Sequence, residues 1–170
     1  MSEFELMNVE ELSETPFKLI GEDWMLITAQ KDDKVNTMTA AWGGLGVMWN
    51  KNVAFMVVRD SRYTKEFIDG SEYYSLCFFD HKEYEKQLIY LGRISGRDES
   101  KIEKSELTVE HYDGVPYFAE SSLVFICRKM YRQHMDPENF LLDHIDSDFY
   151  SDKDYHNLYI GEVTKVLKAK

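Results

Sequence analysis

The segment Asn36-Thr37-Met38-Thr39-Ala40-Ala41-Trp42-Gly43 begins by alternating polar and apolar residues and then flattens into two alanines. Small side chains on a strand let the sheet approach a planar ring closely. The amide and hydroxyl groups of Asn36, Thr37 and Thr39 can hydrogen-bond the polar edge of such a ring. Taken alone, the segment is more typical of an ordinary edge strand of small residues, so a second segment is needed to indicate a ligand.

That second segment is Arg59-Asp60-Ser61-Arg62-Tyr63-Thr64. If a strand ends at Arg59 and a helix begins after Ser61, the unpaired N–H groups of the helix point toward the same place as two guanidiniums and two hydroxyls. Arginine presents planar, paired donors that suit phosphate oxygens. A capped helix with surface arginines is an equally good interpretation of this segment alone. Together, the two segments predict a site for a flat ring attached to a phosphate, as in FMN.

A third segment, Gly92 to Lys101, contains two glycines that permit a tight loop. Ser95, Arg97 and Lys101 could present donors to an electron-rich ring edge or to a second anionic ligand. A plain turn between two helices is the alternative interpretation of the same residues.

The fold class is indicated by apolar runs rich in β-branched and aromatic residues, separated by turn-forming residues. The polar link Lys31-Asp32-Asp33-Lys34 predicts a hairpin turn between two of these runs. We expect a mainly antiparallel sheet curled into a barrel. The predicted strands are Trp24 to Gln30, Val35 to Ala41, Asn52 to Arg59, Tyr73 to Phe79, Leu123 to Met130 and Tyr159 to Leu167.

Three short helices are expected between the strands. Ser61 is the predicted N-terminal cap of the first, which continues through Phe67. Asp80 and Glu83 have the spacing of a capping box, in which two side chains satisfy each other's backbone N–H groups at the start of a helix. The third helix is predicted over 99–104.

Size and composition are those of one domain over residues 1–170, which is long enough to bury a core without a metal or disulfide. The formal net charge of −11 argues against nucleic acid or an anionic membrane as partner. No apolar run approaches the roughly 18 residues that a membrane span needs, and the acidic start does not resemble a signal peptide. We therefore expect a cytoplasmic protein, with Cys77 and Cys127 as buried packing thiols.

The stretch near 132–154 is acidic and weakly periodic, which is typical of an exposed loop or insertion. His134, His144 and His156 accompany several aspartates there and beyond. Their spacing matches no familiar metal motif, so we expect no metal site. For His156, a satisfied strand histidine remains an alternative to a ligand contact.

Four motifs together resemble the flavin reductase-like family with the FMN-binding split-barrel fold, and more narrowly its flavoredoxin-type members. They are Asn36 to Gly43, Arg59 to Thr64, Ser95 to Lys101, and Asp154 to Val163, in the order of the family. The resemblance implies a mainly β fold with α-helices, an antiparallel six-stranded Greek-key barrel with short flanking helices. It also implies a homodimer in which each FMN lies near the subunit interface. The long Tyr131 to Asp154 stretch departs from the compact family pattern, and we expect it near the site entrance.

The resemblance assigns the phosphate side of FMN to the Arg59 to Thr64 segment and the isoalloxazine side to the segment that begins at Asn36. Lys101 and His156 match positions that approach the flavin ring, with the partner chain as one source of them. The predicted cofactor-binding residues are Asn36, Thr37, Met38, Thr39, Ala40, Ala41, Trp42, Arg59, Ser61, Arg62, Tyr63, Thr64, Ser95, Gly96, Arg97, Lys101 and His156.

The function that follows is an oxidoreductase that moves electrons from NADH or NADPH through bound FMN to free flavin, another acceptor or a partner protein. No catalytic side chain is expected, because hydride transfer needs stacked rings about 3–3.5 Å apart and the cofactor supplies the electron sink. The alternative is an FMN-binding electron carrier that exchanges electrons with partner proteins and has little activity toward NADH or NADPH. A barrel whose flavin site has decayed into a dimerisation or ligand-binding module is a third possibility.

Overall fold

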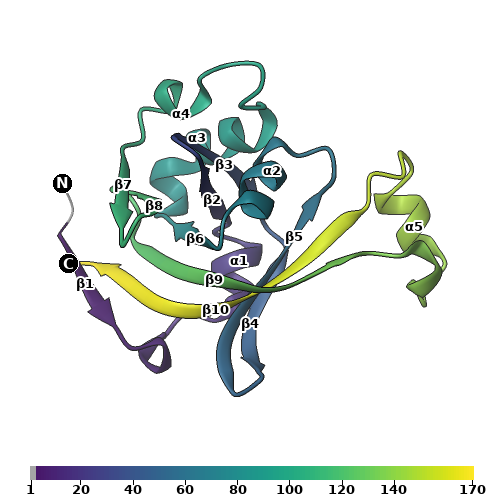
Figure 1. Cartoon of the computed structure of the whole chain (residues 1–170), viewed down its shortest axis with the longest axis horizontal. Coiled ribbons are helices and arrows are strands. Elements are labelled where there is room, and N and C mark those ends of the chain that lie inside the picture. Colours follow the sequence, from purple (N-terminus) through teal and green to yellow (C-terminus); the bar gives the residue numbers. More distant parts are fainter. Residues whose placement is uncertain (1–2) are drawn as a thin grey trace.

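Antiparallel strands form the framework of the protein in the computed structural model, which describes residues 3–170 (Figure 1). The main sheet of this region has eight strands, in the order β3-β2-β6-β9-β10-β5-β4, with β1 also paired to β10. Their bounds are β1 Phe4–Met7, β2 Met25–Lys31, β3 Lys34–Ala40, β4 Gly43–Met48, β5 Lys51–Arg59, β6 Tyr73–Phe78, β9 Leu123–His134 and β10 His156–Ala169. A separate two-stranded sheet pairs β7 (Val109–Tyr112) with β8 (Val115–Phe118).

All six predicted strands are present, and they are the six consecutive neighbours from β3 to β5 in the sheet order. The mainly β prediction is therefore confirmed, with β1 and β4 added at the margins. The hairpin prediction is also confirmed, since Lys31 pairs with Lys34 across a turn in which Asp32 has a φ of 54°. Aspartate tolerates this left-handed conformation better than most residues.

Two hydrophobic clusters lie on opposite faces of the sheet, because neighbouring residues of one strand point to opposite sides. Ile27 and Leu76 belong to the first cluster, whereas their chain neighbours Leu26 and Cys77 belong to the second. Cys127 packs in the first cluster, so both cysteines are buried free thiols, as predicted. Burial raises the pKa of each thiol, which keeps it protonated and unreactive.

The helices cover the sheet between strands (Figure 1). Their bounds are α1 Pro16–Gly21, α2 Tyr63–Gly70, α3 His81–Arg93, α4 Lys101–Lys104 and α5 His144–Phe149, with short 3-10 turns at Val9–Glu11 and Pro137–Asn139. Asp80 caps α3 as predicted, but its carboxylate accepts from the backbone amide of Lys82. The capping-box prediction is wrong in its second half, because no described contact joins the Glu83 side chain to the Asp80 amide.

Strands β9 and β10 form a long ribbon that extends beyond the rest of the sheet and carries α5 at its far end (Figure 1). The stretch predicted to be irregular therefore contains the end of β9, a 3-10 turn and a helix. We call residues 135–155 the ribbon tip. It lies beside the C-terminal end of β5, where the candidate site is found.

Candidate functional site

A cavity of about 210 Å³ opens where β3 and β5 end and β10 begins, and we call it the arginine cavity. The pairing of His156 with Arg59 brings β10 and β5 into register at this point. Its lining residues are Met38, Thr39, Ala40, Ala41, Trp42, Val57, Arg59, Arg62 and His156. All of these except Val57 were predicted as site residues, so the structure brings together parts of three sequence motifs.

The guanidinium of Arg59 is held by the ribbon tip. Its Nη1 donates to the carbonyl of Asp154 at 2.8 Å, and its Nη2 donates to the carbonyl of Phe149 at 2.7 Å. The carboxylate of Asp152 lies 3.6 Å from Nη1. Because the two carbonyls fix the plane of the guanidinium, Arg59 is oriented before any ligand arrives.

Arg62 is fixed from another direction, by the C-terminal end of α3. Its Nη1 donates to the carbonyl of Gly92 at 2.6 Å, a favourable contact because carbonyls at this end of a helix carry partial negative charge. Burial, and next the positive charge of Arg59, lower the pKa of Arg62, while Asp154 acts in the opposite direction. Two neighbouring guanidiniums that repel each other provide a place where an anion is stabilised.

Helix α2 begins one residue later than the capping prediction required. Arg62 is its N-cap residue without a side-chain capping bond, so the prediction that Ser61 caps this helix is wrong. Instead, the amide and hydroxyl of Ser61 both donate to the carboxylate of Asp154. Within residues 3–170 the backbone amides of Tyr63 and Thr64 have no acceptor, as expected at a helix start. These amides remain available to an anion.

A second and larger cavity, of about 630 Å³, lies between β3, α2 and the loop before α4, and we call it the loop cavity. It contains five further predicted site residues, which are Asn36, Tyr63, Gly96, Arg97 and Lys101. The guanidinium of Arg97 lies over the ring of Tyr63, 4.6 Å from its centroid. The site predicted from sequence is therefore divided between two cavities.

Asn36 and Gly96 form the tightest part of the loop cavity. The side-chain amide of Asn36 donates to the hydroxyl of Thr64 at 2.9 Å. A Cβ atom added to Gly96 would lie only 2.4 Å from Oδ1 of Asn36, so the loop approaches β3 as closely as only glycine permits. Thr64 is buried by this arrangement and lines neither cavity.

Lys101 is buried at the start of α4, and its ammonium donates to the carbonyls of Leu91 and Ile94 at 2.9 and 2.8 Å. Burial, and next the charge of Arg62, lower the pKa of Lys101 to about 8. Two of its three N–H groups are thus engaged by the end of α3. Only one N–H group of the Lys101 ammonium is left for the donation to a flavin ring that the sequence predicted.

Thr37 and Ser95, which were also predicted as site residues, line neither cavity. The hydroxyl of Thr37 lies 2.9 Å from that of Thr28 and donates to the carbonyl of Ile27, so this buried side chain belongs to the sheet. Ser95 accepts from the amide of Arg97 and stabilises the local turn. Both side chains thus have hydrogen-bond partners within the chain, and their roles toward a cofactor stay predictions.

The ribbon tip contributes residues that sequence reasoning missed. The hydroxyl of Tyr150 lies 2.7 Å from Nδ1 of His156, and the ring of Phe149 packs edge-on against Trp42 at 5.4 Å between centroids. A signal for them exists in the sequence, because aromatic residues recur within a stretch otherwise read as an acidic loop. Aromatic side chains need burial, which an exposed loop does not provide.

Burial, and next the charge of Arg59, lower the pKa of His156 to about 4. The imidazole is therefore neutral at pH 7, with one nitrogen that donates and one that accepts. Its ring lies 5.2 Å from that of Trp42, on the wall of the arginine cavity.

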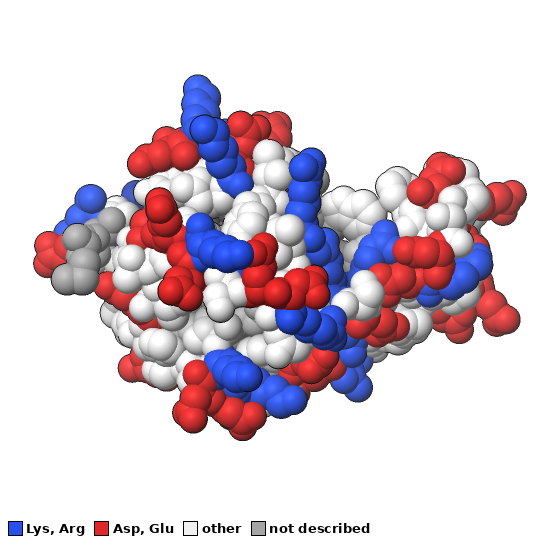
Figure 2. Space-filling model, turned by 90° about the horizontal axis from the view of Figure 1, so that it is seen from above, with Lys and Arg blue, Asp and Glu red and all other residues white. Residues whose placement is uncertain are grey.

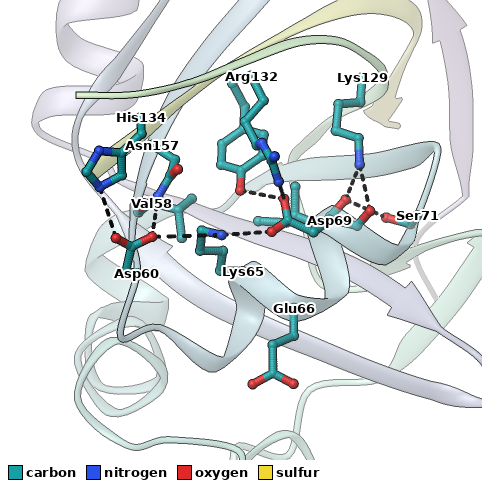
Figure 3. A network of polar contacts seen from close by, with 12 residues as sticks. Val58, Asp60, Lys65, Glu66, Asp69, Ser71, Lys129, Arg132, His134 and Asn157 are labelled. Atoms are coloured by element: carbon teal, nitrogen blue, oxygen red, sulfur yellow. Dashed lines mark hydrogen bonds and ion pairs between the residues drawn. The ribbon is translucent and has the colours of Figure 1, made fainter. Parts of the chain in front are cut away.

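A network of polar side chains fixes α2 against the ribbon (Figure 3). Lys65 lies between two carboxylates, 3.8 Å from Asp60 and 2.8 Å from Asp69. Asp60 accepts from Asn157 of β10 at 2.8 Å, and this bond is the main cause that lowers its pKa. Asp69 accepts from Tyr159 of β10 at 2.7 Å. The start of α2, which lies between Asp60 and Lys65, is held in place by this network.

Charge is distributed unevenly around the site. Figure 2 shows basic side chains where the projecting lobe meets the body of the protein, and both acidic and basic side chains on the lobe itself. Within residues 3–170, no group of three or more His, Cys, Asp or Glu side chains is placed to hold a metal ion. None of the helices in this part of the chain is long and apolar enough to cross a membrane.

Comparison with solved structures identifies the fold. The chain is similar to an FMN-binding domain of a flavin reductase-like enzyme from Shewanella baltica OS155, with a TM-score of 0.72 and 17% identity, over 99% of this chain and 78% of that one. It is similar to flavoredoxin from Methanosarcina acetivorans, with a TM-score of 0.65 and 20% identity, over 96% and 74%. The flavin reductase PheA2 gives a TM-score of 0.60 and 18% identity, over 85% and 77%.

These relationships define the class as the flavin reductase-like split barrel. Residues 18–170 match the family model of the flavin reductase like domain. The chain belongs to the flavin reductase-like family, as its motifs indicated. Comparison with the curated proteins gave no match.

Proposed function

We propose that the protein binds FMN at the arginine cavity and acts as an oxidoreductase. The observation that carries this proposal is the meeting of two guanidiniums with a wall of small residues and Trp42 in one cavity. The guanidiniums suit a phosphate, and the wall suits a flat ring. Family membership supports the same assignment, since relatives of this fold are described as FMN-binding.

The residues present fit a flavin nucleotide in chemistry and only partly in size. Ala40 and Ala41 leave a flat surface beside the ring of Trp42, and Arg62 lacks a carboxylate partner within hydrogen-bond distance among the described residues. Ligand pockets commonly measure about 300–1,000 Å³, whereas this cavity measures about 210 Å³. One chain therefore encloses only part of the cofactor.

A second copy of the chain is the proposed source of the remaining enclosure. Large aromatic side chains remain exposed beside the cavity, on β5 and β9 and in the turn between β4 and β5. They are Trp42, Phe149, Phe55, Tyr131 and Trp49. Exposed apolar surface of this kind marks an interaction site. We propose a homodimer with each site near the interface, which sedimentation at micromolar concentration tests directly.

Bound FMN supplies the electron sink that accepts a hydride from a nicotinamide and releases electrons to an acceptor. The chain's own residues bind the cofactor and orient it. Arg59 and Arg62 neutralise the phosphate, Ala40 to Trp42 shape the surface for the ring, and the ribbon tip shields it from water. NADH or NADPH is the proposed donor, and free flavin, another small acceptor or a partner protein is the proposed acceptor.

The absorption spectrum of the purified protein tests FMN binding. We expect flavin bands, or their appearance with quenching of tryptophan fluorescence when FMN is added, since Trp42 borders the cavity. A colourless protein that also fails to take up FMN would contradict the proposal.

The second candidate function is an FMN-binding electron carrier with little activity toward NADH or NADPH. It is favoured by the resemblance to flavoredoxin and by the same cavity, which serves both functions. Stopped-flow mixing with each nicotinamide separates the two. Fast bleaching of bound FMN supports the reductase, whereas reduction only by a protein donor supports the carrier.

A further inference from the structure

We propose that Tyr150 is a positioning residue, whose hydroxyl donates to Nδ1 of His156 so that the proton of this imidazole lies on Nε2, at the cavity wall. The inference rests on the proposed FMN site for its functional meaning. It concerns a residue of the ribbon tip, where this chain departs from the compact pattern of its family.

The contact itself is short and buried. Tyr150 Oη lies 2.7 Å from His156 Nδ1, and both residues are less than 9% exposed. The same hydroxyl lies 3.6 Å from the sulfur of Met135, which is a weak acceptor. Since a tyrosine has a single proton to donate, the imidazole nitrogen, which is the closer and stronger acceptor, receives it. Nδ1 is then unprotonated, and a neutral imidazole must carry its proton on Nε2.

The other nitrogen of the ring faces the site. Within residues 3–170, Nε2 of His156 has no hydrogen-bond partner, yet it is not among the polar atoms sealed from solvent. His156 lines the arginine cavity, so the open atom is reached from there. An N–H group that is accessible and unpaired is free to donate to an acceptor on a ligand.

Tyr150 is itself held rigidly. Its ring stacks on Phe140 at 5.5 Å between centroids with 12° between the planes, and the guanidinium of Arg59 lies 5.0 Å from its centroid. The backbone carbonyl of the preceding residue, Phe149, accepts from the same guanidinium. One arginine thus connects the proposed phosphate site with the residue that orients the histidine.

The protonation states agree with this arrangement. Burial, and next Arg59, lower the pKa of His156 to about 4, with Asp154 and Arg62 as the other charged groups that act on it. Burial raises the pKa of Tyr150, which keeps its hydroxyl protonated. At neutral pH the pair is therefore a neutral donor and a neutral acceptor.

Nitrogen-15 NMR of histidine-labelled, ligand-free protein tests the tautomer without any cofactor. We expect the His156 signals, assigned by their loss in His156→Gln, to show a protonated Nε2 and an unprotonated Nδ1. In Tyr150→Phe the Nδ1 signal should shift and the tautomers should mix. The matched control is Tyr155→Phe, because Tyr155 belongs to the same aromatic cluster but donates to Asp146. A protonated Nδ1 in the unchanged protein, or identical spectra in Tyr150→Phe, would overturn the proposal.

A second measurement connects the tautomer to the ligand. FMN and riboflavin binding should both weaken about fivefold in Tyr150→Phe, as for loss of one oriented hydrogen bond, and remain unchanged in Tyr155→Phe. If the unchanged protein binds neither flavin while its tautomer is as expected, the proposed function fails and the positioning of His156 stands. If flavin binds equally well to Tyr150→Phe, the proposed role of Tyr150 toward the ligand is wrong.

Discussion

The carboxylate of Asp154 accepts hydrogen bonds from both the backbone amide and the hydroxyl of Ser61, at 3.1 and 2.5 Å. An aspartate of the ribbon tip therefore uses donors that the sequence motif assigns to a phosphate. This carboxylate also offsets part of the positive charge of Arg62, whose pKa it raises against the lowering effects of burial and Arg59. A phosphate bound at the proposed site would therefore compete with the carboxylate of Asp154.

Replacing that carboxylate should strengthen phosphate binding. We expect Asp154→Asn to bind FMN about fivefold more tightly, because removing one negative charge near a dianion is worth about 1 kcal/mol at a solvated site. Riboflavin, which lacks the phosphate, should bind as before. Fluorescence titration with both flavins measures the difference. Asp143→Asn is the control, since Asp143 carries the same charge in the ribbon tip but forms no capping bond at α5; a similar gain there would point to net charge alone.

Loss of Arg59 should have the opposite effect, because it should weaken the binding of FMN more than the binding of riboflavin. Arg59→Ala should weaken FMN binding by about 1.5–3 kcal/mol more than riboflavin binding, the range for a hydrogen bond to a charged group. Arg128→Ala is a suitable control, because Arg128 pairs with Glu72 on the exposed side of β9. Equal losses for both flavins in calorimetric titrations would show that the phosphate lies elsewhere.

The depressed pKa of Lys101 predicts a pH dependence of stability. Its folded pKa of about 8 lies below its ordinary value of 10.5, so the unfolded state binds more protons between these values. The contribution of Lys101 to the free energy of unfolding should therefore rise with pH above about 8. Lys129 contributes with the same sign, whereas the buried thiols Cys77 and Cys127 act in the opposite direction, because their raised pKa values make the folded state bind more protons than the unfolded state near pH 9. The Lys101 contribution is therefore measured as a difference between two proteins. Urea denaturation from pH 7.5 to 9.5 should show a smaller rise in Lys101→Met than in the unchanged protein, and parallel curves would refute the assignment.

The close approach of Gly96 to Asn36 predicts a packing cost. In Gly96→Ala the new Cβ would lie 2.4 Å from Oδ1 of Asn36, a buried side chain held by Thr64. We expect a loss of about 1–3 kcal/mol in the free energy of unfolding, the usual cost of overpacking. Gly46→Ala offers a comparison, since nothing lies within 4 Å of its added Cβ. Thermal unfolding that is equally affected by the two substitutions would argue against the close contact.

The sequence predicted those parts of the fold that depend on local pattern. The six strands from β3 to β5 consist of β-branched and aromatic residues, whose preference for sheets is expressed in the sequence itself. Strand β4 was missed because Gly43, Gly44 and Gly46 disfavour a strand locally, and only pairing with β5 stabilises it.

The site was predicted where motifs converge and missed where distant segments supply the contacts. Arg59, Arg62 and Thr39 meet at one cavity as expected, since strand ends and a helix start determine their places. The bonds from Arg59 to Phe149 and from Ser61 to Asp154 join residues about ninety positions apart. Such contacts depend on how the ribbon folds back, which no local pattern encodes.

The ribbon tip lies outside the ladders that stabilise the barrel, yet its backbone carbonyls orient Arg59 and its side chains form one wall of the site. Insertions and deletions at such a position leave sheet registration untouched. Changes in this appendage could therefore alter the wall of the proposed flavin site, while the strands and helix that hold Arg59 and Arg62 keep their register.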